Sequence, residues 1–416
     1  MSELTVEVYV SDGGVDVEAG TLYSHRRGRT ESATFVYARD YVTRPGAYEL
    51  DPSLPLDTAP SQTPVEQKIF GALSDCAPDR WGRTLIKRAE ARAAREEGRA
   101  TRALGDVDYL LGVRDDLRQG ALRFRIGEGP FLAADDVGVP ALTDLAELMT
   151  LADAAERDDV SLPDLKRLVR VGSSLGGARP KAHVRHPDGR VAIAKFPSAA
   201  FDTWNVMAWE KVALELASRA GIVVPASRLL TLAGRHVLVV DRFDRTPDGA
   251  RVGYVSAMTM LRASDGDQRS YLEIAEAIEE RSARASRDLA QLWRRLLFNV
   301  LISNTDDHLR NHGFLHSGGT SWSLAPAFDL NPQPEPGPKQ LSTFIDTADD
   351  SATVSLAMSV APMFRLPAAH ARRTLGEVAA AVSDWRHVAA QWLAPRGIDE
   401  MAPAFAELDT VPSSLE

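Results

Sequence analysis

In the last third of the chain, the apolar stretch LAQLWRRLLFNVLI (residues 289–302) continues directly into the polar stretch SNTDDHLRNHGF (residues 303–314). Apolar residues of the first stretch recur every three or four positions, which is the period of one helix face. We therefore expect a helix with a deeply buried face. The second stretch contains two aspartates, two histidines and two asparagines, so polar groups gather at the end of a rigid core element.

The composition is that of a globular chain with several parts and an excess of negative charge. Its 416 residues are too many for one ordinary core, so we expect two or three domains or lobes. Hydrophobic residues make up 44% and charged residues 25%, as in ordinary globular proteins. A net charge of −10 argues against broad direct binding to nucleic acid, which requires a basic face.

Disulfide chemistry and membrane insertion find no support in the sequence. The single cysteine, Cys76, excludes an internal disulfide framework and a multi-cysteine zinc site. The first ten residues, MSELTVEVYV, lack the basic and apolar regions of a secretory signal. No apolar run approaches the ~20 residues that cross a bilayer. We expect a cytoplasmic protein without membrane contact.

The first part of the chain changes from strand patterns to helix patterns. Short β-branched and aromatic runs between turn residues predict a β-rich region over residues 4–55. The pattern becomes helical from residue 64, and further helices are predicted at 142–159 and 161–170. Ser161 is a candidate N-terminal cap of the last of these helices.

The middle of the chain predicts a hairpin, a helix and a strand in that order. Two apolar runs on either side of a Pro-Asp-Gly turn predict a hairpin over residues 182–196. A helix is expected over 202–220, ending at Gly221. Residues 235–245 predict a buried strand that continues into a charged segment. The rest is mostly helical, apart from a second hairpin at 313–330.

A glycine-rich stretch, VGSSLGGARPKAHV (residues 171–184), is a candidate phosphate-binding segment. Gly172, Gly176 and Gly177 provide flexible backbone whose amides can approach phosphate oxygens, and Lys181 adds positive charge. The stretch matches neither the P-loop pattern nor GxGxxG. A glycine-rich linker before a hairpin would look much the same.

Lys195 is a second candidate for contact with phosphates. Strand alternation places it on one face with Val191 and Ile193, at the end of an apolar stripe. Lysine is rarely buried without a partner, so a carboxylate from the following helix is expected, with Glu210 as the candidate and Glu215 not excluded. The alternative is an edge lysine that extends to water.

The polar stretch after the core helix has the spacing of a phosphotransfer site. Protein kinases carry a base aspartate five residues before a metal-binding asparagine, with a further metal-binding aspartate after a hairpin. Asp306 lies five residues before Asn311, and Asp329 closes the second predicted hairpin, whereas Asp307 has the wrong spacing. Amide and carboxylate oxygens are the ligands that Mg²⁺ prefers.

The two histidines of the same stretch suggest a metal pair as an alternative. His308 and His312 are four residues apart, but no glutamate stands between them as in HExxH, and a loop need not place both on one face. The favoured interpretation is that one histidine holds the loop through a hydrogen bond and the other lies at the surface. For Asp307 we expect a solvated charge.

Taken in order, these motifs resemble the HipA family of bacterial toxin kinases. The matching stretches are LSDCAPDRWGR (73–83), SSLGGARPK (173–181), VAIAKFP (191–197), LASRAGI (216–222), VLVVDRFDR (237–245), NTDDHLRN (304–311) and AFDLNP (327–332). They cover nearly the whole chain, and the resemblance rests on the ordered set. Residues 256–278 depart from the founding branch, which leaves the target protein open.

The resemblance implies an α+β, two-lobed, protein-kinase-like fold. The β-rich N-terminal lobe would carry an extra N-terminal subdomain, and the C-terminal lobe would be mostly helical. The expected division is an N-terminal subdomain with linking helices at 1–130, an N-lobe with the glycine-rich loop and ATP lysine at 131–255, and a C-lobe with the catalytic loop at 256–416.

The resemblance also implies an activity, namely ATP- and Mg²⁺-dependent phosphorylation of serine on a protein, the known targets being aminoacyl-tRNA synthetases. It makes Asp306 the catalytic base and Asn311 and Asp329 the magnesium ligands. The implied ATP-binding residues are Gly176, Gly177, Ala178, Arg179, Lys181, Lys195, Asp241, Arg242 and Phe243. Supporting roles fall to Glu210 and His308.

The family resemblance extends to regulation and partners. Ser174 matches the loop serine that family members autophosphorylate to switch themselves off, with Ser173 as the neighbouring alternative. Phosphate carries about −1.5 to −2 charges and would repel the phosphates of ATP. The implied partner is a HipB-like helix-turn-helix antitoxin, and contact with DNA would come only through it.

Two other functions remain open. A small-molecule phosphotransferase also uses an aspartate and asparagine at this spacing, but such loops usually read HxDxxxxN, and here Asn304 occupies the histidine position. A non-catalytic scaffold or co-repressor would not require Lys195, Asp306, Asn311 and Asp329, all of which are present.

Overall fold

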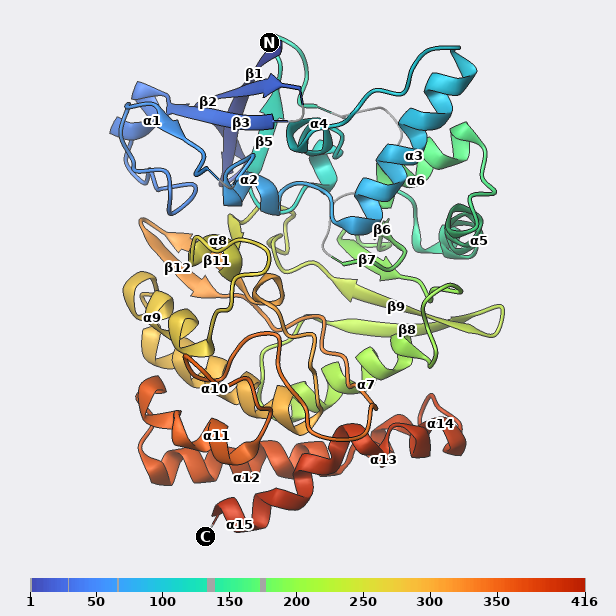
Figure 1. The fold of residues 1–416 in the computed structure, drawn as a ribbon, viewed down its shortest axis with the longest axis vertical. Coiled ribbons are helices and arrows are strands. Elements are labelled where there is room, and N and C mark those ends of the chain that lie inside the picture. Colours follow the sequence, from blue (N-terminus) through green and yellow to red (C-terminus); the bar gives the residue numbers. More distant parts are fainter. Residues whose placement is uncertain (1, 29, 66, 133–138, 173–176, 416) are drawn as a thin grey trace. The chain divides into compact units, whose positions relative to one another are not determined.

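The structure is a computed structural model that describes residues 2–28, 30–65, 67–132, 139–172 and 177–415 (Figure 1). The chain forms two compact units. Unit 1 comprises Met1–Phe201, Val239–Val255 and Gly318–Thr320, and unit 2 comprises Asp202–Leu238, Ser256–Ser317 and Ser321–Glu416. The boundary passes through strands β9 (Arg235–Asp241) and β10 (Tyr254–Ser256). The finer division into three parts remains a prediction.

Unit 1 begins with an antiparallel five-stranded sheet in the order β4-β3-β2-β1-β5, which confirms the β-rich start. Its strands are β1 (Ser2–Asp12), β2 (Val15–Arg27), β3 (Thr30–Tyr37), β4 (Ser61–Gln62) and β5 (Leu122–Arg125). The pairing of β1 with β2 shifts register between Val8 and Tyr9. Alternate residues of these strands, such as Leu22 and Phe35, are buried and form the core of the sheet.

The α-helices in the described part of unit 1 lie between the later strands of this sheet and after its last strand in the sequence. They are α1 (Arg39–Thr43), α2 (Gly71–Asp75), α3 (Arg80–Glu96), α4 (Asp106–Leu111), α5 (Leu145–Glu156) and α6 (Leu162–Gly172). Helix α3 begins where the Asp79 side chain accepts a hydrogen bond from the Gly82 amide, and α3 packs against α6. Ser161 accepts a hydrogen bond from the Asp164 amide, as expected of the cap of α6.

The first predicted hairpin is confirmed in unit 1. Strand β6 (Lys181–Arg185) pairs antiparallel with β7 (Val191–Lys195), and Lys181 lies opposite Lys195. The fully buried face of β7 is formed by Ala192 and Ala194, whereas Lys195 is half-buried on the other face. The apolar stripe expected around Lys195 is therefore the less buried face of the strand, because small alanines pack closest to the core.

Unit 2 contains the predicted helix and strand of the middle of the chain. Helix α7 (Val206–Arg219) begins at the Asn205 cap and ends before Gly221, whose φ of 74° explains why glycine stands there. Strand β8 (Ser227–Leu232) leads through a tight turn into the first half of β9. The strand predicted within 235–245 is confirmed as β9, which ends at Asp241, where the expected charged segment begins.

The rest of unit 2 is mostly helical, as predicted. Its helices are α8 (Ala257–Met260), α9 (Tyr271–Arg281), α10 (Ala285–Leu301), α11 (Val354–Ser359), α12 (Ala368–Ser383), α13 (Trp385–Ala389), α14 (Pro395–Glu400) and α15 (Val411–Leu415). Helix α10 contacts α9, α11 and α12 (Figure 1). Its leucine and tryptophan side chains are buried, as the three- and four-residue spacing predicts.

The polar stretch after α10 connects this core helix to the second hairpin. It contains the short 3₁₀ turn Leu309–Asn311 and leads into β11 (Gly313–Gly318) and β12 (Ser321–Leu324). The loop that follows β12 carries Asp329. Within the described ranges, no helix combines the length and apolar character that crossing a membrane requires.

Candidate active site

The two neighbouring aspartates of the polar stretch lie in opposite environments. Asp306 is exposed, whereas Asp307 is buried and hydrogen-bonded. The expectation that Asp307 is a solvated charge is therefore wrong. An exposed carboxylate beside an anchored one is suited to meet a substrate, because the anchored residue fixes the backbone that both share.

Asp307 is the centre of a buried polar network in unit 2. Its carboxylate accepts a hydrogen bond from the Tyr271 hydroxyl and lies 3.2 Å from the His312 ring nitrogen Nε2. The Tyr271 hydroxyl in turn accepts a hydrogen bond of 3.0 Å from Asn299. Burial opposes ionisation of Asp307, but His312 and these hydrogen bonds outweigh it and hold the pKa of the carboxyl below its usual range.

His312 is the histidine that holds the loop. It is buried, and its ring makes an edge contact with Tyr271 at 5.2 Å between centroids. His308, the residue expected to support the site, is only half-buried, and its main-chain amide donates to the Asp306 carbonyl at 3.0 Å. One histidine thus holds the loop, as expected. It is His312, whereas the supporting role was expected for His308.

Asn311 and the main chain of Asp306 are directly linked. The Asn311 side-chain amide donates a hydrogen bond of 3.0 Å to the Asp306 carbonyl oxygen. The bond uses the nitrogen of the Asn311 amide and not its oxygen. The loop is fastened from outside as well, because Thr343 donates to the Asp307 carbonyl at 2.6 Å and the Ser342 amide donates to the Thr305 carbonyl at 3.0 Å.

The same network reaches the segment that carries Asp329. Asn304 donates to the Asn299 side chain at 3.1 Å and accepts from the Asn331 main-chain amide at 3.3 Å. The Asn331 side chain then donates to the Asp329 carboxylate at 3.3 Å. Asp329 has a φ of 58°, an unfavourable backbone conformation for a residue with a side chain. Such a conformation persists where the surroundings fix it, as this network does.

The residue types of Asn311 and Asp329 suit a magnesium ion. Asn311 and Asp329 offer amide and carboxylate oxygens, which are hard ligands. In the described part of the chain the buried Asn331 Oδ1 has no hydrogen-bond partner, and a cation or its water shell would satisfy it. Clusters of three or more His, Cys, Asp or Glu suited to a metal are absent from the described residues.

The end of the glycine-rich stretch is anchored in unit 1. Ser173, Ser174 and Gly176 lie outside the described residues. Beyond them, Lys181 at the start of β6 forms a 2.6 Å ion pair with Asp79, and both side chains are buried. Gly177, Ala178 and Arg179 lie between.

The lysine and the two candidate glutamates are found on their expected elements. Lys195 ends β7 in unit 1. Glu210 is buried in α7 of unit 2, whereas Glu215 is bonded within its own helix to Arg219 at 2.7 Å. Of the two glutamates that spacing left open, Glu210 therefore remains the candidate for a buried role.

The three residues expected at the adenine edge follow β9, and two of their side chains are engaged elsewhere. The Asp241 carboxylate lies 2.8 Å from His186 Nε2 and 2.5 Å from Arg190 Nη1. The Arg242 guanidinium binds Asp244 with two hydrogen bonds of 2.6 and 2.8 Å and donates to the Leu117 carbonyl at 2.6 Å. A contact of Asp241 or Arg242 with a nucleotide would therefore use main-chain groups.

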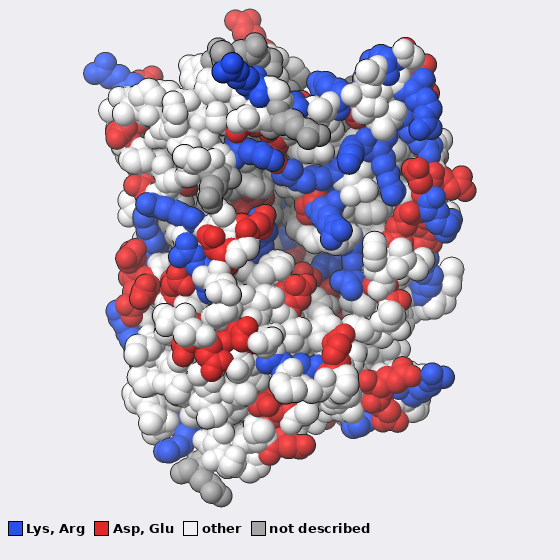
Figure 2. All heavy atoms as spheres, viewed as in Figure 1, with Lys and Arg blue, Asp and Glu red and all other residues white. Residues whose placement is uncertain are grey.

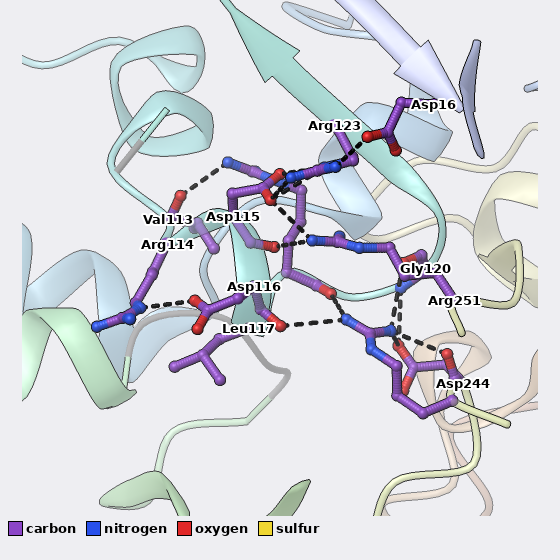
Figure 3. Close-up of polar contacts among 12 residues, drawn as sticks. Asp16, Val113, Arg114, Asp115, Asp116, Leu117, Gly120, Arg123, Asp244 and Arg251 are labelled. Atoms are coloured by element: carbon purple, nitrogen blue, oxygen red, sulfur yellow. Dashed lines mark hydrogen bonds and ion pairs between the residues drawn. The ribbon is translucent and has the colours of Figure 1, made fainter. Parts of the chain in front are cut away.

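Arg242 belongs to a buried cluster of arginines and aspartates in unit 1, shown in Figure 3. Asp115 accepts hydrogen bonds from Arg123 at 2.6 Å and Arg251 at 2.9 Å. Asp244 accepts a bond of 2.8 Å from the Gly120 amide. The cluster joins the segment before β5 to the segment after β9, which are more than a hundred residues apart in sequence.

Several of these residues were not singled out from the sequence. Tyr271, Asn299 and Asn304 link the aspartates of the site, and Asp79 binds Lys181. Asp79 had a signal, since it lies inside the family-like stretch at 73–83. For the polar network, the presence of Asn299 and Asn304 close to the end of an otherwise apolar helix was a weaker signal than the family-like stretch was for Asp79.

Comparisons with known proteins identify the family of the chain. Residues 173–385, about half of the chain, match the family model for the HipA-like C-terminal domain. Two curated relatives are the candidate kinase Y4dM of Sinorhizobium fredii, 28% identical over 152 residues, and a candidate kinase of Haemophilus influenzae, 26% identical over 144 residues. These matches cover 33% and 30% of this chain, and 36% and 42% of the relatives' own length.

A solved structure is similar over almost the full length. It is HipA of Shewanella oneidensis MR-1, determined in a complex with HipB and operator DNA. The match has a TM-score of 0.64 at 15% identity and covers 98% of this chain and 96% of that chain. At this identity the likeness concerns the fold, and it confirms the predicted α+β, kinase-like architecture. The family match and the fold together show that this chain belongs to the HipA family.

Proposed function

We propose that this chain is an ATP- and Mg²⁺-dependent serine/threonine protein kinase and the toxin of a HipBA-like toxin–antitoxin module. The observation that carries the proposal is the pair of adjacent aspartates. Asp306 is exposed and lies five residues before Asn311, while Asp307 is buried in a network that extends to Asp329. A scaffold would not require this preorganised arrangement of carboxylates.

In the proposed reaction, Asp306 accepts the proton of a serine or threonine hydroxyl as the γ-phosphoryl group is transferred. Asn311 and Asp329 would hold a magnesium ion, which would supply positive charge to neutralise the ATP phosphates. Asp307 and His312 keep the loop in place and take no part in proton transfer, because both are buried. Lys195 and Lys181 provide positive charge for the phosphates, supported by Glu210.

The nucleotide contacts follow from the same proposal. Gly176 to Arg179 would place main-chain amides over the phosphates. Because the side chains of Asp241 and Arg242 are bound elsewhere, these two residues would meet the adenine through main-chain groups, next to Phe243. Ser174, with Ser173 as the alternative, is the proposed site of autophosphorylation.

The proposed partners follow from the relatives and from the charge of the chain. The similar HipA was solved with HipB and operator DNA, which supports a helix-turn-helix antitoxin as partner here. The net charge of −10 favours DNA contact through that antitoxin rather than directly. The proposed substrate is a serine of a protein, with an aminoacyl-tRNA synthetase as the first candidate.

The proposal is tested by inducing wild type and Asp306→Asn in bacteria and recording growth and the phosphoproteome. Growth arrest by wild type alone, with a new phosphoserine on a synthetase, is the expected result. Arrest by both proteins would favour the scaffold function. ATP consumption by the purified protein only when a small acceptor is added would favour a small-molecule phosphotransferase.

A further inference from the structure

The segment that begins α3 contacts the described end of the glycine-rich stretch at two points. The Trp81 main-chain amide donates to the Gly177 carbonyl oxygen at 3.4 Å. Two residues earlier, the Asp79 carboxylate forms the 2.6 Å ion pair with Lys181. On the other side of the stretch, a Cβ on Gly172 would lie 3.4 Å from the Trp81 ring nitrogen. All these residues belong to unit 1.

The two carboxylate oxygens of Asp79 have different partners, and this arrangement allows Asp79 to hold Lys181 in place. One carboxylate oxygen, Oδ1, accepts the 2.7 Å hydrogen bond from the Gly82 amide that caps α3. The other oxygen, Oδ2, accepts from the Lys181 ammonium. The carboxylate is therefore fixed by a helix of 17 residues, and it fixes the ammonium in turn.

The burial of this ion pair requires an explanation other than stability. The Asp79 and Lys181 side chains are only 4% and 5% exposed. Burial raises the pKa of Asp79 in spite of the nearby ammonium. Desolvation of two charges offsets much of their attraction, so a buried pair is weak evidence for stability, and such pairs are best known for fixing one arrangement.

We propose that Asp79 is a positioning residue of the nucleotide site. It holds the Lys181 ammonium at the end of the glycine-rich stretch, where the ammonium meets the phosphates of ATP, while the Trp81 amide holds Gly177. This inference rests on the proposed function and deepens it, because it gives residues of the N-terminal region a part in ATP binding. Asp79 itself touches no nucleotide.

The test compares the affinities of wild type and Asp79→Asn for Mg·ATP and for adenosine by titration calorimetry. Asparagine caps a helix about as well as aspartate, so α3 is preserved while the charge is removed. We expect ATP binding to weaken about tenfold, equivalent to about 1.4 kcal/mol. Adenosine binding should change less than about twofold, because Lys181 meets only the phosphates.

Matched variants separate positioning from general damage. Lys181→Ala should weaken ATP binding like Asp79→Asn, and the double variant should add nothing, because both act through one ammonium. Asp79→Ser keeps a capping side chain that is too short for the lysine, and it should repeat the loss. Asp106→Asn breaks the ion pair of Asp106 with Arg83, which joins α4 to α3, and should leave both affinities unchanged.

The binding measurements distinguish failure of the positioning role of Asp79 from failure of the proposed kinase function. If wild type binds neither ATP nor adenosine, the proposed function fails, and the positioning role fails with it. If wild type binds both and Asp79→Asn binds ATP equally well or more tightly, the positioning role alone is contradicted. Equal losses for ATP and adenosine would also contradict it, because they would show a structural role.

Discussion

At the scale of single residues, Asp306 and Asp307 offer a matched pair for mutation. Asp307→Ala leaves the Tyr271 hydroxyl and the His312 ring without their buried acceptor, so it should cost about 3 kcal/mol or more of unfolding free energy. Asp306→Ala removes an exposed side chain and should stay within about 0.5 kcal/mol. Urea unfolding measures both, and equal costs would contradict the network.

Cys76 gives a second prediction at this scale. Its side chain is buried and contacts the Gln119 carbonyl, and burial raises the pKa of the thiol to about 12. Since the thiolate is the reactive form, the native protein should resist iodoacetamide at neutral pH. The same protein unfolded in guanidinium should be labelled completely, as mass spectrometry can show. Rapid labelling of the native chain would mean that Cys76 is accessible.

The spacing of the polar stretch selects Asp306 and Asn311 as candidates, but it did not predict the environment of Asp307. An aspartate five residues before an asparagine is a local pattern, and the 3.0 Å bond between the Asn311 side chain and the Asp306 carbonyl is local too. The burial of Asp307 depends on Tyr271, which is 36 residues earlier in the chain. A local pattern carries no information about such a tertiary partner.

At the scale of elements, two helical glycines predict opposite effects. In Gly172→Ala at the end of α6, the new Cβ would lie 2.5 Å from the Lys181 carbonyl oxygen, so the strand or helix must shift at a cost of about 1–3 kcal/mol. Gly376→Ala inside α12 meets nothing within 4 Å and should stabilise by about 0.5–1 kcal/mol. Thermal unfolding of both variants tests this, and stabilisation by Gly172→Ala would contradict the packing.

Elements that depend on contiguous residues were predictable from the sequence, whereas contacts between residues far apart in the chain were not. The turn between β6 and β7 and the three- and four-residue period of α10 are written in contiguous residues. Strand β5 joins the first sheet by pairing with β1 across more than a hundred residues. The Asp79–Lys181 ion pair likewise spans 102 positions, so the pair itself was visible only in the fold.

At the scale of the whole molecule, charge is organised by pairing. The face in Figure 2 carries both basic and acidic side chains, with wide uncharged areas between them. Helix α3 is rich in arginine, yet its Arg83 pairs with Asp106 and its Arg92 with Asp158. The negative net charge and these pairs agree with a chain that is not expected to bind DNA broadly on its own.

The buried cluster in Figure 3 predicts a pH dependence of stability. Burial opposes ionisation of Asp244, but Arg242 and Arg245 outweigh it and lower its pKa. A lowered pKa means that this stabilisation is present above the unfolded value of about 3.9 and is lost as the pH falls further. Asp244→Ala should cost roughly 3–5 kcal/mol at neutral pH, because two buried guanidinium groups lose their partner.

Urea unfolding of wild type and Asp244→Ala across this pH range provides the measurement. The difference between them should be largest at neutral pH and shrink below about pH 4. A difference that grows on acidification would contradict the sign of the shift. The exposed Asp248 serves as control, since Asp248→Ala should cost no more than about 0.5 kcal/mol.

The most direct test of phosphotransfer is the intact mass of the purified protein after incubation with Mg·ATP. Wild type should gain the mass of phosphate, located by peptide mapping to Ser174 or Ser173. Asp306→Asn should gain none while remaining folded, because it lacks the base but keeps the buried network around Asp307. An unchanged wild-type mass, or an equal gain by Asp306→Asn, would contradict Asp306-dependent self-phosphorylation.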